Sequence, residues 1–126
     1  MEEEYGYRKL IIWKNAGEIR RIVYAMCKQF PKIEMRRISQ MNDAARSVKQ
    51  NIQEGHFKTT KDYRRYLMIS RGSINELRGD IDDCREDGLI TEEQHQQLDS
   101  RIGQTDYLIT KTIKGLESKI KERCFK

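Results

Sequence analysis

Apolar residues recur along this chain at alternating steps of four and three, in four separate segments. The clearest segment runs from Tyr63 to Cys84 through steps of 4, 3, 4, 3, 4 and 3. This spacing places the apolar residues on one face of an α-helix, because one helical turn takes about 3.6 residues. The four patterns predict helices over residues of about 9–30, 34–54, 60–87 and 91–122.

Polar residues and glycines between the segments indicate where the helices begin and end. Gly55 is the expected stop of the second helix, and a loop is expected after it. Thr59 or Thr60 is expected to cap the third helix, and Gly88 to end it. Thr91 precedes two acids and a glutamine, which is typical of a capped helix start. The connections are therefore short.

Four helices with short connections predict an all-α fold, an antiparallel up-down-up-down four-helix bundle. The chain has 126 residues and one proline, Pro31, which suits a single domain over residues 1–126 built from long helices. No segment approaches the ~20 apolar residues of a membrane span. The acidic start at Glu2–Glu4 is unlike a signal peptide, so we expect a cytoplasmic protein.

Apolar and aromatic residues outnumber the positions that the four helix seams offer. About half of the surplus fits a wide core, and the remainder would form an exposed apolar patch that soluble monomers rarely carry. We therefore expect a homo-oligomer. The surplus residues are Leu10, Ile11, Trp13, Ile22, Tyr24, Tyr66, Met68, Ile69, Tyr107 and Leu108.

Glycines inside the predicted helices point in the same direction. Each costs roughly 1 kcal/mol relative to alanine. We expect close helix packing, within the bundle or between subunits, to offset this cost. The glycines concerned are Gly72, Gly79, Gly103 and Gly115.

Charge is unevenly distributed along the sequence. Residues 1–78 contain 17 Lys/Arg and 9 Asp/Glu, whereas residues 79–126 contain 8 and 11. The two parts therefore carry +8 and −3, which agrees with the net charge of +5. A basic body with an acidic end favours polyanion binding on one surface, and it is equally compatible with head-to-tail self-assembly.

The basic residues of the predicted helices follow a spacing of their own. Two sets of three residues are each seven apart: Lys14, Arg21 and Lys28, and Arg64, Arg71 and Arg78. Seven residues are two helical turns, so each set forms a stripe with repeats about 10 Å apart. Such stripes could follow nucleic-acid phosphates, although a solvated helix face or a protein contact would produce the same pattern.

Motifs for catalysis and metal binding are absent from the sequence. There is no GxSxG, HExxH, GxxxxGK[ST] or GxGxxG, and Ser73 lies in mid-helix without a plausible histidine base. The scattered cysteines and distant histidines argue against a disulfide scaffold or a zinc site. Asp80, Asp83 and Asp87 share a helix face but lack the ExxH partner of di-iron bundles. We expect no enzymatic activity, no metal and no cofactor.

Six segments, taken in order, resemble one protein family. The most specific are Asn51–Gly55 (NIQEG) and Gly72–Leu77 (GSINEL). The set resembles the four-helix-bundle proteins encoded in intervening sequences of bacterial large-subunit ribosomal RNA genes. That group is similar to the accessory variability determinant of diversity-generating retroelements. The resemblance covers nearly the whole chain, and the other segments are Leu10–Ala16, Val23–Tyr24, Phe30–Lys32 and Ala44–Val48.

The resemblance implies a homopentameric barrel of antiparallel bundles without enzymatic activity. For the retroelement branch it also implies a basic surface that binds RNA or DNA and a partnership with a reverse transcriptase. The motif residues are expected to be structural, with Asn51 and Glu54 bonding backbone groups near the loop after Gly55. They are Asn51, Glu54, Gly55, Ser73 and Glu76.

This sequence departs from the family pattern at two places. Lys49 stands where a proline is common, and Arg36-Arg37 replaces a common step of an aromatic residue and a glycine. Both changes add positive charge. They favour the branch that binds nucleic acid.

We therefore expect a non-enzymatic nucleic-acid-binding accessory protein that holds RNA or an RNA–DNA hybrid for a reverse transcriptase. The alternative is a protein–protein scaffold with no direct role in nucleic-acid binding. Binding through phosphates would weaken steeply with salt and depend little on sequence. The residues expected to contact phosphates are Lys14, Arg21, Lys28, Arg36, Arg37, Arg46, Lys49, Lys61, Arg64, Arg71 and Arg78.

Overall fold

The structure, a computed structural model, describes residues 6–124 without the side chains of Arg8 and Lys9. The acidic start of the chain lies outside these residues. Four α-helices make up most of the described chain, which contains no strand, and the predicted all-α class is confirmed. The elements are η1 (Gly6–Lys9), α1 (Ile11–Cys27), η2 (Lys32–Glu34), α2 (Met35–His56), α3 (Thr60–Glu86) and α4 (Glu92–Cys124), where η denotes a short 3-10 helix.

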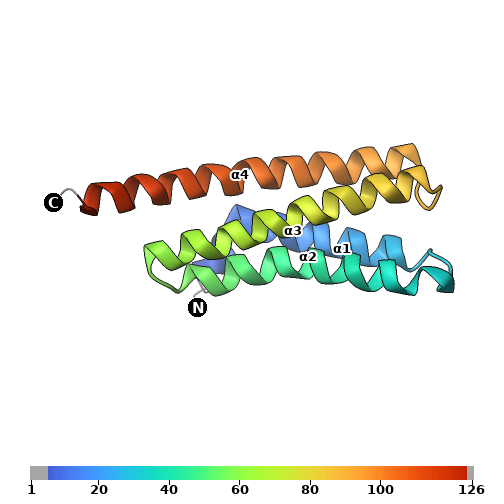
Figure 1. Cartoon of the computed structure of the whole chain (residues 1–126), viewed down its shortest axis with the longest axis horizontal. Coiled ribbons are helices and arrows are strands. Elements are labelled where there is room, and N and C mark those ends of the chain that lie inside the picture. Colours follow the sequence, from blue (N-terminus) through green and yellow to red (C-terminus); the bar gives the residue numbers. More distant parts are fainter. Residues whose placement is uncertain (1–5, 125–126) are drawn as a thin grey trace.

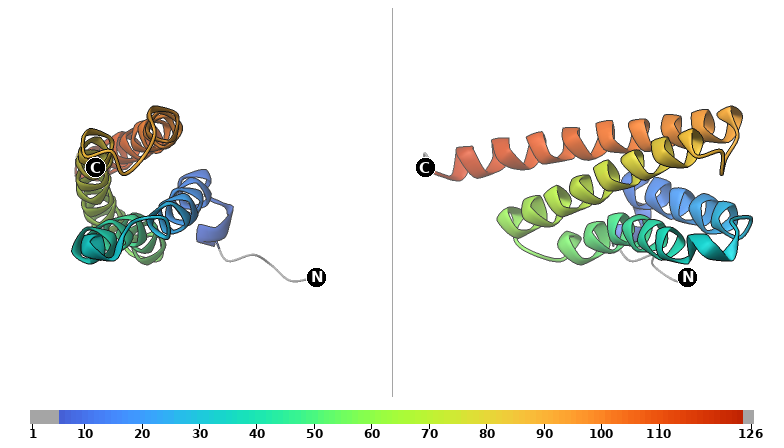
Figure 2. Two further views of the ribbon diagram at one scale, coloured as in Figure 1. Left: turned by 90° about the vertical axis from the view of Figure 1, so that its right-hand side faces the viewer. Right: turned by 45° about the vertical axis from the view of Figure 1, so that its right-hand side comes forward.

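The four helices pack against one another in the order of the sequence, and α1 also contacts α4. Figure 1 shows the chain turning back at each connection and α4 reaching past the other helices at its C-terminal end. In the end-on view of Figure 2, α1 (blue) and α4 (orange) lie at the two ends of a curved row of helices. The contact between α1 and α4 is the smallest of the four, and that between α2 and α3 is the largest.

The predicted helix seams form the core. Ile19, Met41, Ile74 and Ile102, one from each helix, are fully or almost fully buried. The seam position Ser70 is also buried, and its hydroxyl donates to a backbone carbonyl of α2 at 2.9 Å.

No helix in the described part of the chain is long and apolar enough to cross a membrane.

Hydrogen bonds confirm the two predicted helix starts. Thr59 Oγ1 accepts from the backbone N–H of Asp62 at 3.2 Å, so Thr59 caps α3. At the start of α4, the backbone N–H of Gln94 donates to Thr91 Oγ1 at 3.0 Å. The backbone N–H of Thr91 donates to Gln94 Oε1 at 2.8 Å in return. Gly88 follows α3 with a φ of 76°, as expected of a glycine stop.

The end of α2 differs from the prediction. The helix continues through Gly55 to His56, so Gly55 is not a stop. Gly55 is buried against α3, and a Cβ added there would lie 2.6 Å from the Cβ of Tyr66. The glycine therefore allows two helices to approach closely, a role that the local sequence does not reveal.

The surplus apolar residues divide much as the wide-core interpretation suggests. Those that are partly buried against the core are Leu10, Trp13, Ile22 and Leu108. Tyr66 is half-buried. Those that remain exposed on the subunit are Ile11, Tyr24, Met68, Ile69 and Tyr107. The homo-oligomer that would cover them stays a prediction.

The helical glycines also fall into two groups. A Cβ added at Gly103 would lie 2.9 Å from Nη2 of Arg78 on α3. At Gly72, Gly79 and Gly115 an added Cβ would meet no atom within 4 Å. Only Gly103 of the four therefore has a close neighbour on the described chain, and that neighbour is the end of a flexible side chain.

Candidate nucleic-acid interface

Helices α1 and α2 bring several cations together where they cross. Gly17 is buried, and a Cβ added there would lie 3.7 Å from Nη1 of Arg21 and from both Cε and Nζ of Lys49. The ammonium group of Lys49 lies 4.6 Å from the ring centroid of Trp13. Lys49 thus reaches from α2 over α1, in a cation–π contact that leaves its charge near the surface.

We name this surface the α1–α2 basic face, and it consists of Lys14, Arg20, Arg21, Arg46 and Lys49. Burial lowers the pKa of Lys49, and the positive charges of Arg20 and Arg21 add to the effect. Among the described side chains, no carboxylate forms an ion pair with any of the five. The face therefore holds concentrated positive charge that no carboxylate of the described residues neutralises by an ion pair.

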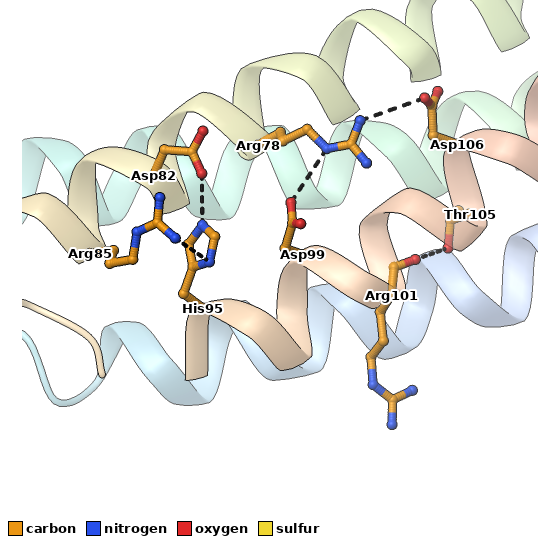
Figure 3. A network of polar contacts seen from close by, with 8 residues as sticks. All are labelled: Arg78, Asp82, Arg85, His95, Asp99, Arg101, Thr105 and Asp106. Carbon is orange, nitrogen blue, oxygen red and sulfur yellow. Dashed lines mark hydrogen bonds and ion pairs between the residues drawn. The ribbon is translucent and has the colours of Figure 1, made fainter. Parts of the chain in front are cut away.

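The three arginines of the predicted α3 stripe are in a different situation, because each of them faces a carboxylate of α4. Arg64 pairs with Glu117 at 2.7 Å, and Arg71 pairs with Asp106 at 3.4 Å. Arg78 lies 3.5 Å from Asp99 and 3.8 Å from Asp106, as Figure 3 shows.

The predicted stripe on α3 is therefore a ladder of ion pairs between two helices. This geometry gives no support to a role of the three arginines in phosphate contact. Arg37, another predicted contact, is also paired, at 2.7 Å from Asp87 and 2.9 Å from Glu34. Its hydrogen bond with Asp87 raises the pKa of the guanidinium.

The remaining predicted cations lie away from the basic face or at its margin. Lys28 lies over the ring of Tyr24 one turn earlier, at 4.6 Å. Arg36 is exposed at the start of α2, and Lys61 is exposed at the start of α3. The structure thus brings together Arg21 and Lys49 of the predicted set. Lys14 and Arg46 are exposed on the same two helices, two turns before Arg21 and about one turn before Lys49. The basic face also includes Arg20, which the seven-residue spacing omits. Its position next to the seam residue Ile19 could have suggested it.

The motif residues of α2 and α3 join these two helices. Asn51 Nδ2 donates to the backbone oxygen of Ser47 at 2.8 Å and to Ser47 Oγ at 3.0 Å. Ser73 Oγ donates to the same hydroxyl at 2.8 Å. The expectation that Asn51 and Glu54 bond to the loop after Gly55 is therefore wrong for Asn51, which bonds one turn back. Glu54 and Glu76 are exposed.

An aromatic cluster adjoins the basic face at Trp13. The ring centroid of Tyr7 lies 5.4 Å from that of Trp13 and 5.5 Å from that of Phe57. The ring centroids of His56 and Tyr63 are 5.6 Å apart. Trp13 Nε1, His56 Nδ1 and the Tyr63 hydroxyl are buried without a hydrogen-bond partner on the described chain. Burial also raises the pKa of Tyr63. These rings form an aromatic cluster at the margin of the face.

A polar network closes the opposite end of the bundle, between α3 and α4. The ring of His95 is buried, with Nε2 at 2.7 Å from Asp82 and Nδ1 at 3.2 Å from Arg85, as Figure 3 shows. A guanidinium can only donate, so Nδ1 accepts and the Nε2–H donates to the carboxylate. No group of three or more His, Cys, Asp or Glu within the described residues could hold a metal ion.

These features define a helical protein with one basic two-helix face and one ion-paired side. A family model described as 23S rRNA-intervening sequence protein matches residues 8–111, so the chain belongs to that family. The chain is also similar in fold to a solved protein of unknown function from the S23 ribosomal protein family of Bacteroides thetaiotaomicron. That match has a TM-score of 0.71 and 21% identity, covering 82% of this chain and 99% of the other. No curated protein matches the chain significantly.

Proposed function

We propose that this protein is a non-enzymatic accessory protein that holds nucleic acid on its α1–α2 basic face. The observation that carries the proposal is the concentration of cations there without carboxylate partners among residues 6–124, in contrast to the paired arginines of the α3 stripe. Phosphates would supply the missing counter-charge. Release of condensed counterions then provides most of the binding free energy.

The chemistry of this face favours the backbone of the nucleic acid over its bases. Lys14 and Arg21 are two turns apart on α1, or about 10 Å, and both side chains are long and flexible. Trp13 is half-buried beneath Lys49, which leaves its ring little room to stack on a base. We therefore expect RNA or an RNA–DNA hybrid to be held with little sequence preference.

The finer part of the proposal follows the family resemblance. The bundle of antiparallel helices would assemble into a homopentameric barrel in the cytoplasm, with one basic face per subunit. A reverse transcriptase would be the partner that works on the held strand. Repetition of the face around a ring would raise the affinity for a long strand through effective concentration.

Fluorescence anisotropy with a short labelled RNA tests the proposal. Affinity should fall steeply between about 50 and 200 mM salt, with a slope of about 0.7 per phosphate contact for a single strand. The double variant Arg21→Glu/Lys49→Glu should lower both the affinity and this slope. Its control, Lys114→Glu/Lys119→Glu, reverses the same number of exposed charges on α4 and should retain most of the affinity. An affinity that does not change with salt concentration, or an equal loss of affinity in the two double variants, would refute the proposal.

A protein–protein scaffold is the second candidate, and exposed apolar side chains at one end of the bundle favour it. Ile33 and Met35, at the connection before α2, are 89% and 70% exposed. Methionine is enriched in protein interfaces relative to the rest of the surface. Purification at moderate salt separates the candidates. Absorbance at 260 nm that stays with the protein supports nucleic-acid binding, and protein partners without such absorbance support the scaffold.

A further inference from the structure

Phe57 is the exposed member of the aromatic cluster beside the α1–α2 basic face. It is 64% exposed at the end of α2, whereas Tyr7, Trp13 and Tyr63 of the same cluster are half-buried. An exposed aromatic side chain by itself is ordinary, since apolar atoms cover much of any protein surface. Phe57 is different because it lies within a cluster that borders concentrated positive charge.

The short helix η1 joins Phe57 to the basic face. This element contacts both α1 and α2, and the ring of Tyr7 lies 5.4 Å from Trp13 and 5.5 Å from Phe57. A Cβ added at Gly6 would lie 2.8 Å from Nε2 of His56, so the glycine lets η1 approach the end of α2 closely. The ring of His56 is in turn 5.8 Å from that of Phe57. Neighbouring rings therefore position Phe57 and leave most of it open to a ligand.

Cations without carboxylate partners lie close to these rings. The ammonium group of Lys49 is 4.6 Å from the ring centroid of Trp13, which contacts Tyr7. Lys58 directly follows Phe57, is exposed, and forms no ion pair with another described side chain. Nucleotides rise about 3.4 Å each along a stacked strand, so a few of them cover the path from Lys49 to Phe57. A basic surface with an open aromatic ring is the arrangement that binds single-stranded nucleic acid.

We propose that the basic face holds RNA as a single strand, with one unpaired base stacked on the ring of Phe57. Inside a duplex both faces of a base are covered by its neighbours, so only an unpaired base can present its face to an aromatic side chain. Trp13 cannot serve in this way, because Lys49 lies over its ring. Every base has such a face, and stacking is therefore compatible with little sequence preference. The inference rests on the proposed function, and it selects single-stranded RNA over the RNA–DNA hybrid.

Substitutions at Phe57 separate stacking from charge. The probes are a labelled oligouridine, which does not pair with itself, and the hybrid of the same oligouridine with oligodeoxyadenosine. Phe57→Ala should lower the affinity for the single strand roughly fivefold to a hundredfold, the usual effect of removing one stacking ring. The slope of affinity against salt should stay as in the wild type, because no phosphate contact is lost. Phe57→Leu keeps an apolar side chain without a ring and should lose as much, whereas Phe57→Trp should retain the affinity.

Tyr107 provides the matched control on another helix. It is 61% exposed on α4, and the ammonium group of Lys111 lies 5.5 Å from its ring centroid. Tyr107→Ala thus removes an equally exposed ring beside a cation, and it should leave both affinities unchanged. The wild type should bind the single strand more tightly than the hybrid, although the hybrid carries twice the charge. Circular dichroism compares the folding of all variants with that of the wild type.

Three results would overturn the stacked base while leaving salt-dependent binding in place. They are an unchanged single-strand affinity in Phe57→Ala, an equal loss by that variant on the hybrid, and full affinity in Phe57→Leu. Phe57 variants that lose a protein partner and keep RNA would also overturn it, in favour of a protein contact. Binding that does not depend on salt, or that survives in Arg21→Glu/Lys49→Glu, counts instead against the proposed function, and the stacked base would then fail with it.

Discussion

The cations of α1 and the arginines of α3 follow the same seven-residue spacing, yet their surroundings differ. Helix α3 lies beside α4, which places Asp99, Asp106 and Glu117 opposite the arginine stripe. Helix α1 lies beside α2, which adds Lys49 to the positive charge of Arg21. A stripe of charge on one helix therefore acquires its role from the neighbouring helix. On α3 the stripe forms ion pairs with α4, whereas on α1 it has none among the described residues, and there we propose that it contacts phosphates.

The largest expected effect comes from reversing the paired stripe. Arg71→Glu/Arg78→Glu would remove ion pairs at the surface and place like charges beside Asp106 and Asp99. We expect the free energy of unfolding to fall by about 2 kcal/mol, because partly exposed pairs are screened by solvent. RNA affinity should change far less than in the variant of the basic face. Chemical denaturation and anisotropy on the same samples measure both effects. A stable variant that has lost RNA binding would show that the α3 stripe contacts RNA in the same way as the α1–α2 basic face.

A smaller change would make the α3 stripe resemble the α1–α2 basic face, because it would leave arginines without a carboxylate partner. Asp106→Asn removes the carboxylate shared by Arg71 and Arg78. The free energy of unfolding should fall by about 1 kcal/mol or less, since the pairs lie near the surface. RNA affinity should rise about two- to fivefold, because the freed cations can contact phosphates. The control is Asp43→Asn, which removes an exposed carboxylate without an ion pair on the described chain. An unchanged affinity in Asp106→Asn would show that the ion pairs with Asp106 do not keep Arg71 and Arg78 from contacting RNA.

One glycine in each region offers a matched pair of substitutions. Gly17→Ala should stabilise the protein by up to about 1 kcal/mol, because alanine favours a helix more than glycine does. The added Cβ would lie 3.7 Å from its nearest neighbours, which is an ordinary van der Waals distance. Gly103→Ala should stabilise less, since its Cβ would lie 2.9 Å from the guanidinium of Arg78 and displace it from the ladder. Thermal unfolding followed by circular dichroism measures the difference. Equal gains in both variants would contradict the close packing at the ladder.

The smallest expected effect concerns the cost of unpaired charge. Because the pKa of Lys49 is lowered in the folded protein, its charged form is less favourable there than in the unfolded chain. Lys49→Gln should therefore raise the free energy of unfolding by a few tenths of a kcal/mol at neutral pH, after screening by solvent. This gain should disappear as the pH rises through the pKa of the lysine and the wild type loses its charge. Denaturation at neutral and alkaline pH tests the sign, and a loss of stability at neutral pH would contradict it.

The sequence predicts the fold well because its strongest signals are local. Seam spacing and the Thr59 and Thr91 caps each depend on residues within a few turns of one another. The ion-pair ladder could not be predicted in this way, since Arg71 and Asp106 are 35 residues apart and meet only when two helices share a register. The same limit applies to Gly55, whose neighbour Tyr66 belongs to the next helix. Local pattern specifies each helix, and the pairing of faces requires the assembled bundle.

The close joining of α2 and α3 has a consequence for how the chain folds. Their contact is the largest in the bundle, and it includes the bond between Ser47 and Ser73 and the approach at Gly55. The two helices are adjacent in sequence, so forming this hairpin closes only a short stretch of chain and loses little entropy. We expect the hairpin to serve as the folding nucleus, with α1 and α4 docking onto it later and opening first.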